Sequence, residues 1–158
     1  MNLFGFFAQA EPLALGAPVP DVSAVDQDGT PVQLRDVCVQ GITLVYFYPK
    51  ADTPGCTAQA CSLRDSFADL KADGLRIYGV SHDSPAAQKK FREKYTLPFT
   101  LLSDSDGKVA AAFGVPTTLG FTSRQSFVFK DGKVAWTSLK AKTGDHAAEV
   151  QAALNSLK

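Results

Sequence analysis

The chain has 158 residues, of which 45% are apolar and 20% are charged. A chain of this length is most simply one domain that buries about 70% of its unfolded surface. Lysine and arginine together number 16, as do aspartate and glutamate, so the formal net charge is zero. A neutral chain has no overall field to attract nucleic acid or an anionic membrane, and we expect neither as a partner.

The N-terminal residues 1–8 are apolar, but they are too few to span a membrane and lack a basic region of the kind that opens a signal peptide. We therefore expect an N-terminal extension over residues 1–14 and a single domain over residues 15–158. Without an export signal the default compartment is the cytoplasm. Cysteines there are more often reactive, metal-binding or simply buried than joined in structural disulfides.

Two strand signals open the domain. Asp28-Gly29 separates two short apolar runs, a pattern that predicts an N-terminal β-hairpin over residues 22–34. Residues 43–48 (Thr-Leu-Val-Tyr-Phe-Tyr) form a continuous run of apolar, β-branched and aromatic side chains, which is typical of a buried strand. Pro49 then ends this strand, since proline has no N–H for a sheet.

A helix is predicted over residues 54–73, where apolar side chains recur with a helical period. Thr53 is a good N-cap, Pro54 suits the first helical position, and Gly74 follows the last turn. Cys56 then falls near the third helical residue, where free backbone N–H groups and the helix dipole favour a thiolate.

The rest of the chain alternates strand and helix signals. In chain order we expect a strand over 75–81, a helix from Ser84 to Leu97, a strand over 99–103, a short helix over 108–113, strands over 125–129 and 134–138, and a last helix capped by Asp145. This order predicts an α/β domain of three layers. Its βαβ core, ending in a hairpin and a helix, favours a thioredoxin-like fold with a central mixed sheet.

Cys56 has the setting of a reactive thiol. An ordinary thiol is only a few per cent thiolate at neutral pH, and the thiolate is the nucleophile. A helix N-terminus or a nearby cation lowers thiol pKa values to about 3.5–7.5. The helix end is present here, but Lys50 is the only basic residue of the preceding loop. The cation must therefore come from another part of the chain.

The spacing of Cys56 and Cys61 limits how they can bond. Cα atoms five residues apart on an ideal helix are ~8.6 Å apart, from a rise of ~7.5 Å and an angular offset of ~140°. A disulfide needs Cα atoms about 4.4–6.8 Å apart. Either the two cysteines never meet, or the first turns of the helix unwind to bring them together.

Other interpretations of the cysteines have to be weighed. A cysteine at a helix start is often only a small buried hydrophobe. A zinc site would need a second pair of ligands, and His82 and His146 have no ligand-like spacing. A thioredoxin-type dithiol would need Cys-x-x-Cys, which the chain lacks. The geometry alone favours a redox function, with no metal and no organic cofactor expected.

These residues resemble a known family. Residues 46–50 (Tyr-Phe-Tyr-Pro-Lys) and 52–57 (Asp-Thr-Pro-Gly-Cys-Thr), followed by Ala60-Cys61, are similar to the peroxiredoxin Q subfamily, also known as bacterioferritin comigratory proteins. Pro49, Thr53 and Cys56 fit the general peroxiredoxin signature Pro-x-x-x-Thr-x-x-Cys. Further similar segments lie at 79–84, 97–104, 107–109, 112–115 and 124–128. The resemblance covers roughly residues 15–155.

The resemblance implies a thiol peroxidase with an intramolecular disulfide. Cys56 would be the peroxidatic cysteine that forms a sulfenic acid, and Cys61 the resolving cysteine that condenses with it. Thioredoxin or a glutaredoxin-like donor would then reduce the disulfide. Thr53 would hydrogen-bond the thiolate and the peroxide, and Arg124 would be the missing cation.

The resemblance also extends to neighbouring positions and to the state of assembly. It implies that Pro49 shields the thiolate from water, and it favours a monomer. The family usually has glutamate three residues after the peroxidatic cysteine, whereas this chain has Gln59, a neutral amide that can hydrogen-bond but cannot form an ion pair. Cys38 and His82 match no family role.

One rival interpretation belongs to another functional class. A thiol redox sensor or relay would keep the cysteine pair but pass its disulfide to a partner protein. Thr53 and Arg124 favour turnover over this alternative, because a sensor needs a reactive thiol but no site that holds a peroxide.

Overall fold

A computed structural model describes residues 11–158 of the chain. Residues 1–10, most of the expected N-terminal extension, lie outside the described part. The strands of the main sheet are β1 (Ser23–Asp26), β2 (Pro31–Gln33), β3 (Ile42–Phe47), β4 (Leu75–Ser81), β5 (Thr100–Ser103), β8 (Gln125–Lys130) and β9 (Lys133–Ser138). Their order across the sheet is β2-β1-β5-β4-β3-β8-β9. The central mixed sheet and the N-terminal hairpin of β1 and β2 are confirmed.

The middle of the sheet is parallel and its flanks are antiparallel. β3 pairs in parallel with β4, and β4 with β5. β8 runs antiparallel to β3 on one side, and β1 antiparallel to β5 on the other. The parallel connections contain the helices α2 (Pro54–Asp65), α3 (Phe67–Ala72) and α4 (Pro85–Lys94). The other helices are α1 (Leu34–Cys38), α5 (Lys108–Phe113) and α6 (His146–Ser156).

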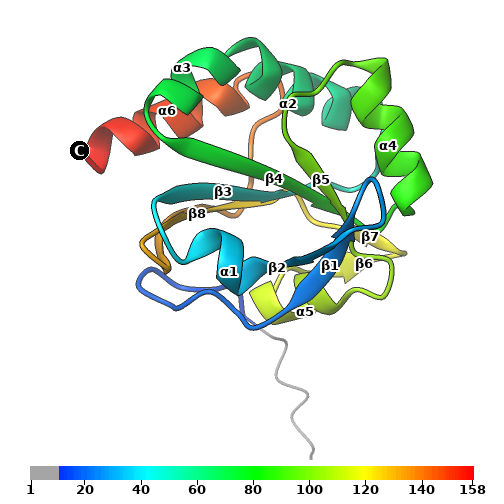
Figure 1. Ribbon diagram of the computed structural model, residues 1–158, viewed down its shortest axis with the longest axis horizontal. Helices are drawn as coiled ribbons and strands as arrows, with labels where there is room; N and C mark the ends of the chain where they lie inside the picture. Colours follow the sequence, from blue (N-terminus) through cyan, green and yellow to red (C-terminus); the bar gives the residue numbers. More distant parts are fainter. Residues whose placement is uncertain (1–10) are drawn as a thin grey trace, which may run out of the picture.

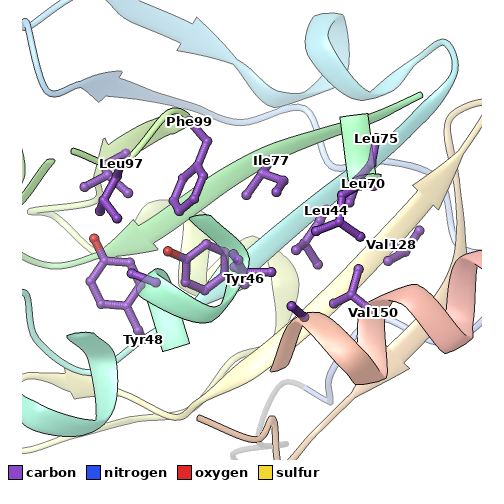
Figure 2. Packing of buried hydrophobic residues seen from close by; sticks show 14 of the residues in the cluster. Leu44, Tyr46, Tyr48, Leu70, Leu75, Ile77, Leu97, Phe99, Val128 and Val150 are labelled. Atoms are coloured by element: carbon purple, nitrogen blue, oxygen red, sulfur yellow. The ribbon is translucent and has the colours of Figure 1, made fainter. Parts of the chain in front are cut away.

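β3 lies between two hydrophobic cores because its side chains alternate in direction. Leu44, Tyr46 and Tyr48 face a core that also takes in residues of α2, α3, α4 and α6 (Figures 1 and 2). Val45 and Phe47 face the opposite core, built with residues of α1 and α5. All five side chains are completely buried. The sheet is thus covered on both faces, and the carboxyl end of β3 leads directly into the cysteine segment.

The predicted single helix over 54–73 is wrong: the structure has two helices, α2 and α3, separated at Ser66. Ser66 has φ −102° and ψ 7°, outside the helical region, and it ends α2 while preceding α3. Serine forms helices weakly because its hydroxyl competes for backbone groups, so the chain leaves helical geometry there at low cost. Gly74 follows α3 with φ 85°, as expected for a residue just beyond a helix end.

Other differences are local. Leu34, assigned to the hairpin, instead begins α1, whose N-cap is Gln33. A two-stranded hairpin of β6 (Thr117–Thr118) and β7 (Phe121–Thr122) was not predicted. Strands of two residues are too short to leave a measurable periodicity in a sequence, so nothing in the pattern of residues indicates this hairpin. The last helix, α6, has Ala147, Val150 and Leu154 buried as expected, and Asp145 is its N-cap residue, but the Asp145 side chain makes no cap hydrogen bond.

Candidate active site

Cys56 is the third residue of α2 and lies at its positive end. Thr53 is the N-cap residue, with extended backbone angles of φ −93° and ψ 157°. Its carbonyl accepts from the N–H of Thr57 at 2.8 Å, which starts the helical ladder. Its side chain makes no cap hydrogen bond; the hydroxyl donates instead to the carbonyl of Lys50 at 2.7 Å. Thr53 therefore fixes the loop before the helix with its hydroxyl proton.

Arg124 supplies the cation beside the thiol. Its Nη1 and Nη2 atoms both lie 3.5 Å from Sγ of Cys56. Nη1 also donates to Oε1 of Gln59 at 2.7 Å. The neutral amide of Gln59 thus orients the guanidinium by a hydrogen bond, as expected where an ion pair cannot form. Gln59 is completely buried, and its Nε2 has no hydrogen-bond partner among the described residues.

Because Gly55 has no side chain, the guanidinium of Arg124 can pack closely against the first turn of α2. A Cβ atom at this position would lie 3.1 Å from Nη2 of Arg124 and 3.5 Å from Cγ2 of Thr143. The first contact is tighter than ordinary packing, so a larger side chain would press the guanidinium away. From the sequence alone, Gly55 has no predicted function. Its one signal is a glycine inside a helix, where it costs about 1 kcal/mol relative to alanine.

The loop between β3 and α2 is anchored by hydrogen bonds to residues of other elements. Asp52 has a positive φ of 60°, and its carboxylate accepts from Nζ of Lys94 at 2.8 Å and from the hydroxyl of Tyr95 at 2.7 Å. The N–H of Ala51 donates to the carboxylate of Asp83 at 2.8 Å. These contacts join the loop to α4 and to the end of β4, so the start of α2 is fixed on both sides.

The two other cysteines have different surroundings. Cys61 lies in the same helix as Cys56, is partly exposed, and both thiols are free. The helix is continuous between them, so the structure shows the state in which the spacing forbids a bond. Cys38 lies in α1 and is completely buried. Burial raises the pKa of its thiol to about 12, which makes Cys38 a poor nucleophile at neutral pH.

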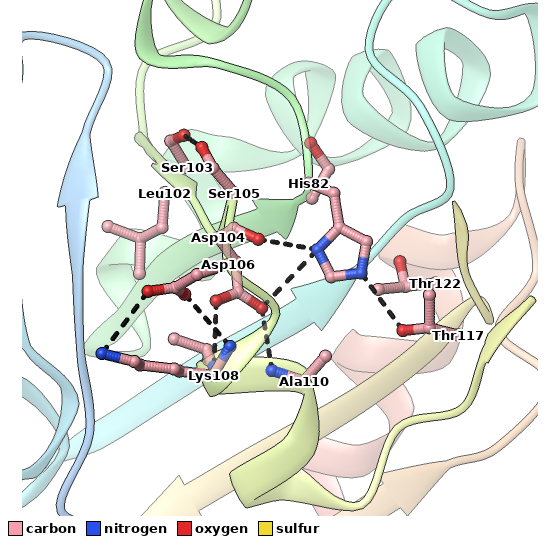
Figure 3. Close-up of polar contacts among 12 residues, drawn as sticks. His82, Leu102, Ser103, Asp104, Ser105, Asp106, Lys108, Ala110, Thr117 and Thr122 are labelled. Atoms are coloured by element: carbon pink, nitrogen blue, oxygen red, sulfur yellow. Dashed lines mark hydrogen bonds and ion pairs between the residues drawn. The ribbon is translucent and has the colours of Figure 1, made fainter. Parts of the chain in front are cut away.

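His82 lines the same surface hollow as Pro49, and both nitrogens of its ring make structural contacts (Figure 3). Its Nδ1 is 2.7 Å from the carbonyl of Asp104, and its Nε2 is 3.1 Å from the hydroxyl of Thr117 in β6. The carboxylate of Asp104 in turn accepts from two N–H groups in the first turn of α5. His82 thus connects the β6–β7 hairpin to the end of β5.

Pro49 is half-buried and lines a small surface hollow of about 110 Å³. The hollow is lined by Pro49, Lys50, His82, Asp83, Gly120 and Phe121. Phe121 is partly exposed, and Thr122, which follows it, donates to the carbonyl of Tyr48 at 2.9 Å. The β6–β7 hairpin therefore forms one wall of the surface beside the cysteine loop.

Residues 11–158 contain no group of three or more His, Cys, Asp or Glu side chains placed to hold a metal ion. In the same residues no helix is long and apolar enough to cross a membrane.

Fold and site together define a thioredoxin-like protein with a thiol held between a helix N-terminus and an arginine. The model of the AhpC/TSA family matches residues 15–137, and the chain belongs to this family. Peroxiredoxin Bcp of Escherichia coli K12 is 45% identical over 143 residues, which cover 85% of this chain and 91% of that protein. A chloroplastic peroxiredoxin Q of Oryza sativa subsp. japonica is 44% identical over 77% of this chain and 57% of its own length.

Solved structures agree with the sequence relatives. Peroxidoxin BcpB of Mycobacterium tuberculosis superposes with a TM-score of 0.84 at 36% identity, covering 92% of this chain and 99% of that one. Peroxiredoxin Q of Xanthomonas campestris has a TM-score of 0.81 at 32% identity, over 91% and 96% of the two chains. A structure of the X. campestris bacterioferritin comigratory protein, described for its alkyl peroxide reduction activity, has a TM-score of 0.82 at 31% identity over 92% and 97%.

Proposed function

We propose that this chain is a thiol-dependent peroxidase that reduces hydrogen peroxide and organic hydroperoxides. The observation that carries the proposal is the position of Arg124, whose two Nη atoms flank Sγ of Cys56 at the start of α2. The positive charge and the helix N-terminus both stabilise a thiolate, and they also favour the negative charge that develops on the leaving oxygen. The relatives named for peroxiredoxin activity support the same function.

In the first step the Cys56 thiolate attacks the distal oxygen of the hydroperoxide. An S–O bond forms, the O–O bond breaks, and the leaving alkoxide or hydroxide takes a proton to become an alcohol or water. Cys56 is left as a sulfenic acid. Thr53 takes part by accepting a hydrogen bond from the peroxide O–H, since its own hydroxyl proton is directed at the Lys50 carbonyl. Pro49 limits access of water from the side of the hollow.

In the second step the thiol of Cys61 condenses with the sulfenic acid. An S–S bond forms and water leaves. A dithiol such as thioredoxin or glutaredoxin then reduces the disulfide by two thiol–disulfide exchanges and becomes oxidised itself. The cycle needs no second subunit, because both cysteines belong to one helix of one chain, and the family resemblance favours a monomer. The residues of the cycle need no organic cofactor or metal.

The function is tested by following NADPH consumption with thioredoxin, its reductase and a hydroperoxide. Turnover is expected in the wild type and in Cys38→Ala, a control that removes the buried third cysteine. Cys56→Ser should lose nearly all activity. A folded wild-type protein that shows no turnover with either thioredoxin or glutaredoxin would contradict the proposal.

The resolving cysteine needs its own experiment. Cys61→Ser is expected to consume one equivalent of peroxide and then to stop as a sulfenic acid, which dimedone traps and mass spectrometry detects. Normal cycling of Cys61→Ser with thioredoxin would mean that Cys61 does not resolve the sulfenic acid.

A redox sensor or relay is the second candidate, favoured by the partial exposure of Cys61. It predicts rapid oxidation of Cys56 but slow reduction by thioredoxin. A single burst of peroxide consumption without steady turnover, in the wild type, would support it.

A further inference from the structure

Glu149, in the first turn of α6, uses one carboxylate oxygen for two contacts. Its Oε1 accepts from the backbone N–H of Lys142 at 2.8 Å and lies 2.6 Å from Nδ1 of His146. Because an ionised carboxylate can only accept hydrogen bonds, Nδ1 of His146 carries a proton. Glu149 therefore holds the segment before α6 at Lys142 and the first residue of the helix at His146.

The other side of the His146 ring faces the sheet. Its Nε2 lies 3.0 Å from the hydroxyl of Ser126 in β8. Burial lowers the pKa of His146 and the charge of Arg124 acts in the same direction, while Glu149 opposes both. The neutral ring then accepts a hydrogen bond from Ser126 at Nε2. A continuous chain of contacts runs from Glu149 through His146 to Ser126.

The order Ser–His–Glu is that of a hydrolase triad, but this one cannot act as such. Ser126 and His146 have no exposed surface at all. Ser126 lies inside the central sheet, opposite Tyr46 of β3, where no substrate can reach its hydroxyl. The contacts therefore have a positional rather than a chemical role.

Ser126 and the segment that Glu149 holds both lie next to Arg124. Ser126 follows it by two residues, so the two side chains lie on the same face of the extended chain. The carbonyl of Arg124 accepts from the N–H of Ala141 at 3.0 Å, just before the segment that Glu149 holds. The methyl group of Thr143 borders the same space at Gly55 that the guanidinium borders. The N–H of His146 donates to the carbonyl of Thr143 at 3.2 Å and closes the turn.

We propose that Glu149 is a positioning residue for the reacting thiol: by holding residues 141–146 against Arg124, it keeps the guanidinium beside Sγ of Cys56. Loss of the Glu149 contacts frees the segment and lets the guanidinium move toward solvent, so the Cys56 thiolate loses its two donors. The proposal rests on the proposed function only in taking Cys56 as the reacting thiol.

The test follows alkylation of Cys56 by iodoacetamide in the reduced full-length protein as a function of pH. Fragment-ion mass spectrometry distinguishes alkylation at Cys56 from alkylation at Cys61, since no lysine or arginine lies between the two and both fall in one tryptic peptide. Glu149→Ala is expected to raise the pH midpoint of alkylation by about 0.5 unit or more, with a roughly threefold slower reaction at neutral pH. Glu149→Gln keeps the carbonyl acceptor for both contacts and should stay close to the wild type. Asp145→Asn, an exposed carboxylate of the same segment, is the matched control and should change nothing.

The direction in which the pH midpoint of Cys56 alkylation moves distinguishes a positioning role of Glu149 from a direct effect of its negative charge. A carboxylate that acted only through its charge would disfavour the thiolate, so Glu149→Ala and Glu149→Gln would both lower the midpoint. That result, or an unchanged midpoint in Glu149→Ala, would overturn the proposal. Should Glu149→Ala fail to fold by circular dichroism, Ser126→Ala decides: a raised midpoint supports the proposal and an unchanged or lowered one overturns it. Since no peroxide is used, failure of the peroxidase proposal does not affect this test.

Discussion

Arg124 places both of its Nη atoms 3.5 Å from Sγ of Cys56, across 68 positions of sequence. The contact between the two side chains depends on other residues that fix each of them in place. The thiol is fixed by the first turn of α2, and the guanidinium is fixed by Gln59 and by the space that Gly55 leaves. The reactivity that we propose for Cys56 therefore depends on two parts of the chain, the start of α2 and the residue just before β8.

This relationship predicts that the shape of the cation matters as well as its charge. Arg124→Met should slow the reaction of Cys56 with hydrogen peroxide about 10- to 150-fold, the equivalent of charge-assisted hydrogen bonds of about 1.5–3 kcal/mol. Arg124→Lys should fall between this variant and the wild type, because an ammonium keeps the charge but lacks the planar fork that places two nitrogens beside Sγ. Stopped-flow measurement of the second-order rate constant provides the comparison.

The control for this series is Arg35→Met, since the Arg35 side chain is 65% exposed and, among residues 11–158, pairs only with Asp21 at 3.6 Å. Its rate constant should equal that of the wild type. A rate for Arg124→Met within about twofold of the wild type would show that the guanidinium contributes little to the chemistry.

Cys38 is expected to be inert in the native protein. With a pKa of about 12, only about one thiol in 10⁴ is ionised at pH 8. In the reduced protein at pH 8, a thiol reagent should therefore modify Cys56 and Cys61 and leave Cys38 unmodified until denaturant is added. Modification of Cys38 at the rate of Cys61 would indicate that α1 opens readily.

Much of the fold and part of the site could be predicted from the sequence. The apolar run of β3 and the Thr53-Pro54 start of α2 are local signals, and both placed Cys56 correctly. Arg124 came from the family resemblance, because no spacing rule joins residues 68 positions apart. The contacts of His146 had no signal in the sequence. Its contact with Ser126 spans 20 residues, and its contact with Glu149 has the same i, i+3 spacing as any surface pair on a helix.

Another prediction concerns the free energy of unfolding and compares Tyr46, near the end of β3, with Tyr48, which directly follows the strand. Tyr46 and Tyr48 are both completely buried and face the same core (Figure 2). The hydroxyl of Tyr48 donates to Oε1 of Gln88, whereas the hydroxyl of Tyr46 has no partner among the described residues. Tyr48→Phe should lower the free energy of unfolding by about 1–2 kcal/mol, because it breaks a hydrogen bond and leaves a buried amide oxygen unpaired.

Tyr46→Phe removes only the unpaired hydroxyl, so the free energy of unfolding should stay the same or rise by about 1 kcal/mol. Urea denaturation of the two variants measures the difference directly, and each serves as the control for the other. Equal losses in both variants would mean that the hydroxyl of Tyr46 has a partner in solution, such as a buried water.

The last prediction concerns the opening of α2. The helix is continuous from Cys56 to Cys61, and an ideal helix separates their Cα atoms by ~8.6 Å, beyond the about 4.4–6.8 Å of a disulfide. The proposed disulfide between Cys56 and Cys61 therefore requires hydrogen bonds of the first turns to break, such as the 2.8 Å bond from Thr57 N–H to the Thr53 carbonyl.

Opening is easiest at this end because a helix frays from its termini and the N-cap side chain makes no cap hydrogen bond, although Cys56, Gln59 and Ala60 are buried and their packing opposes it. In the disulfide form, amides 56–61 should exchange with deuterium faster than in the reduced form. Amides of β3 should keep their protection, since the strand has partners on both sides. Cys61→Ser treated with the same peroxide is the control, because it cannot form this disulfide and its helix should stay closed. If mass spectrometry confirms the bond between Cys56 and Cys61 while exchange over 56–61 is unchanged, the spacing argument is wrong and the helix accommodates the disulfide without unwinding.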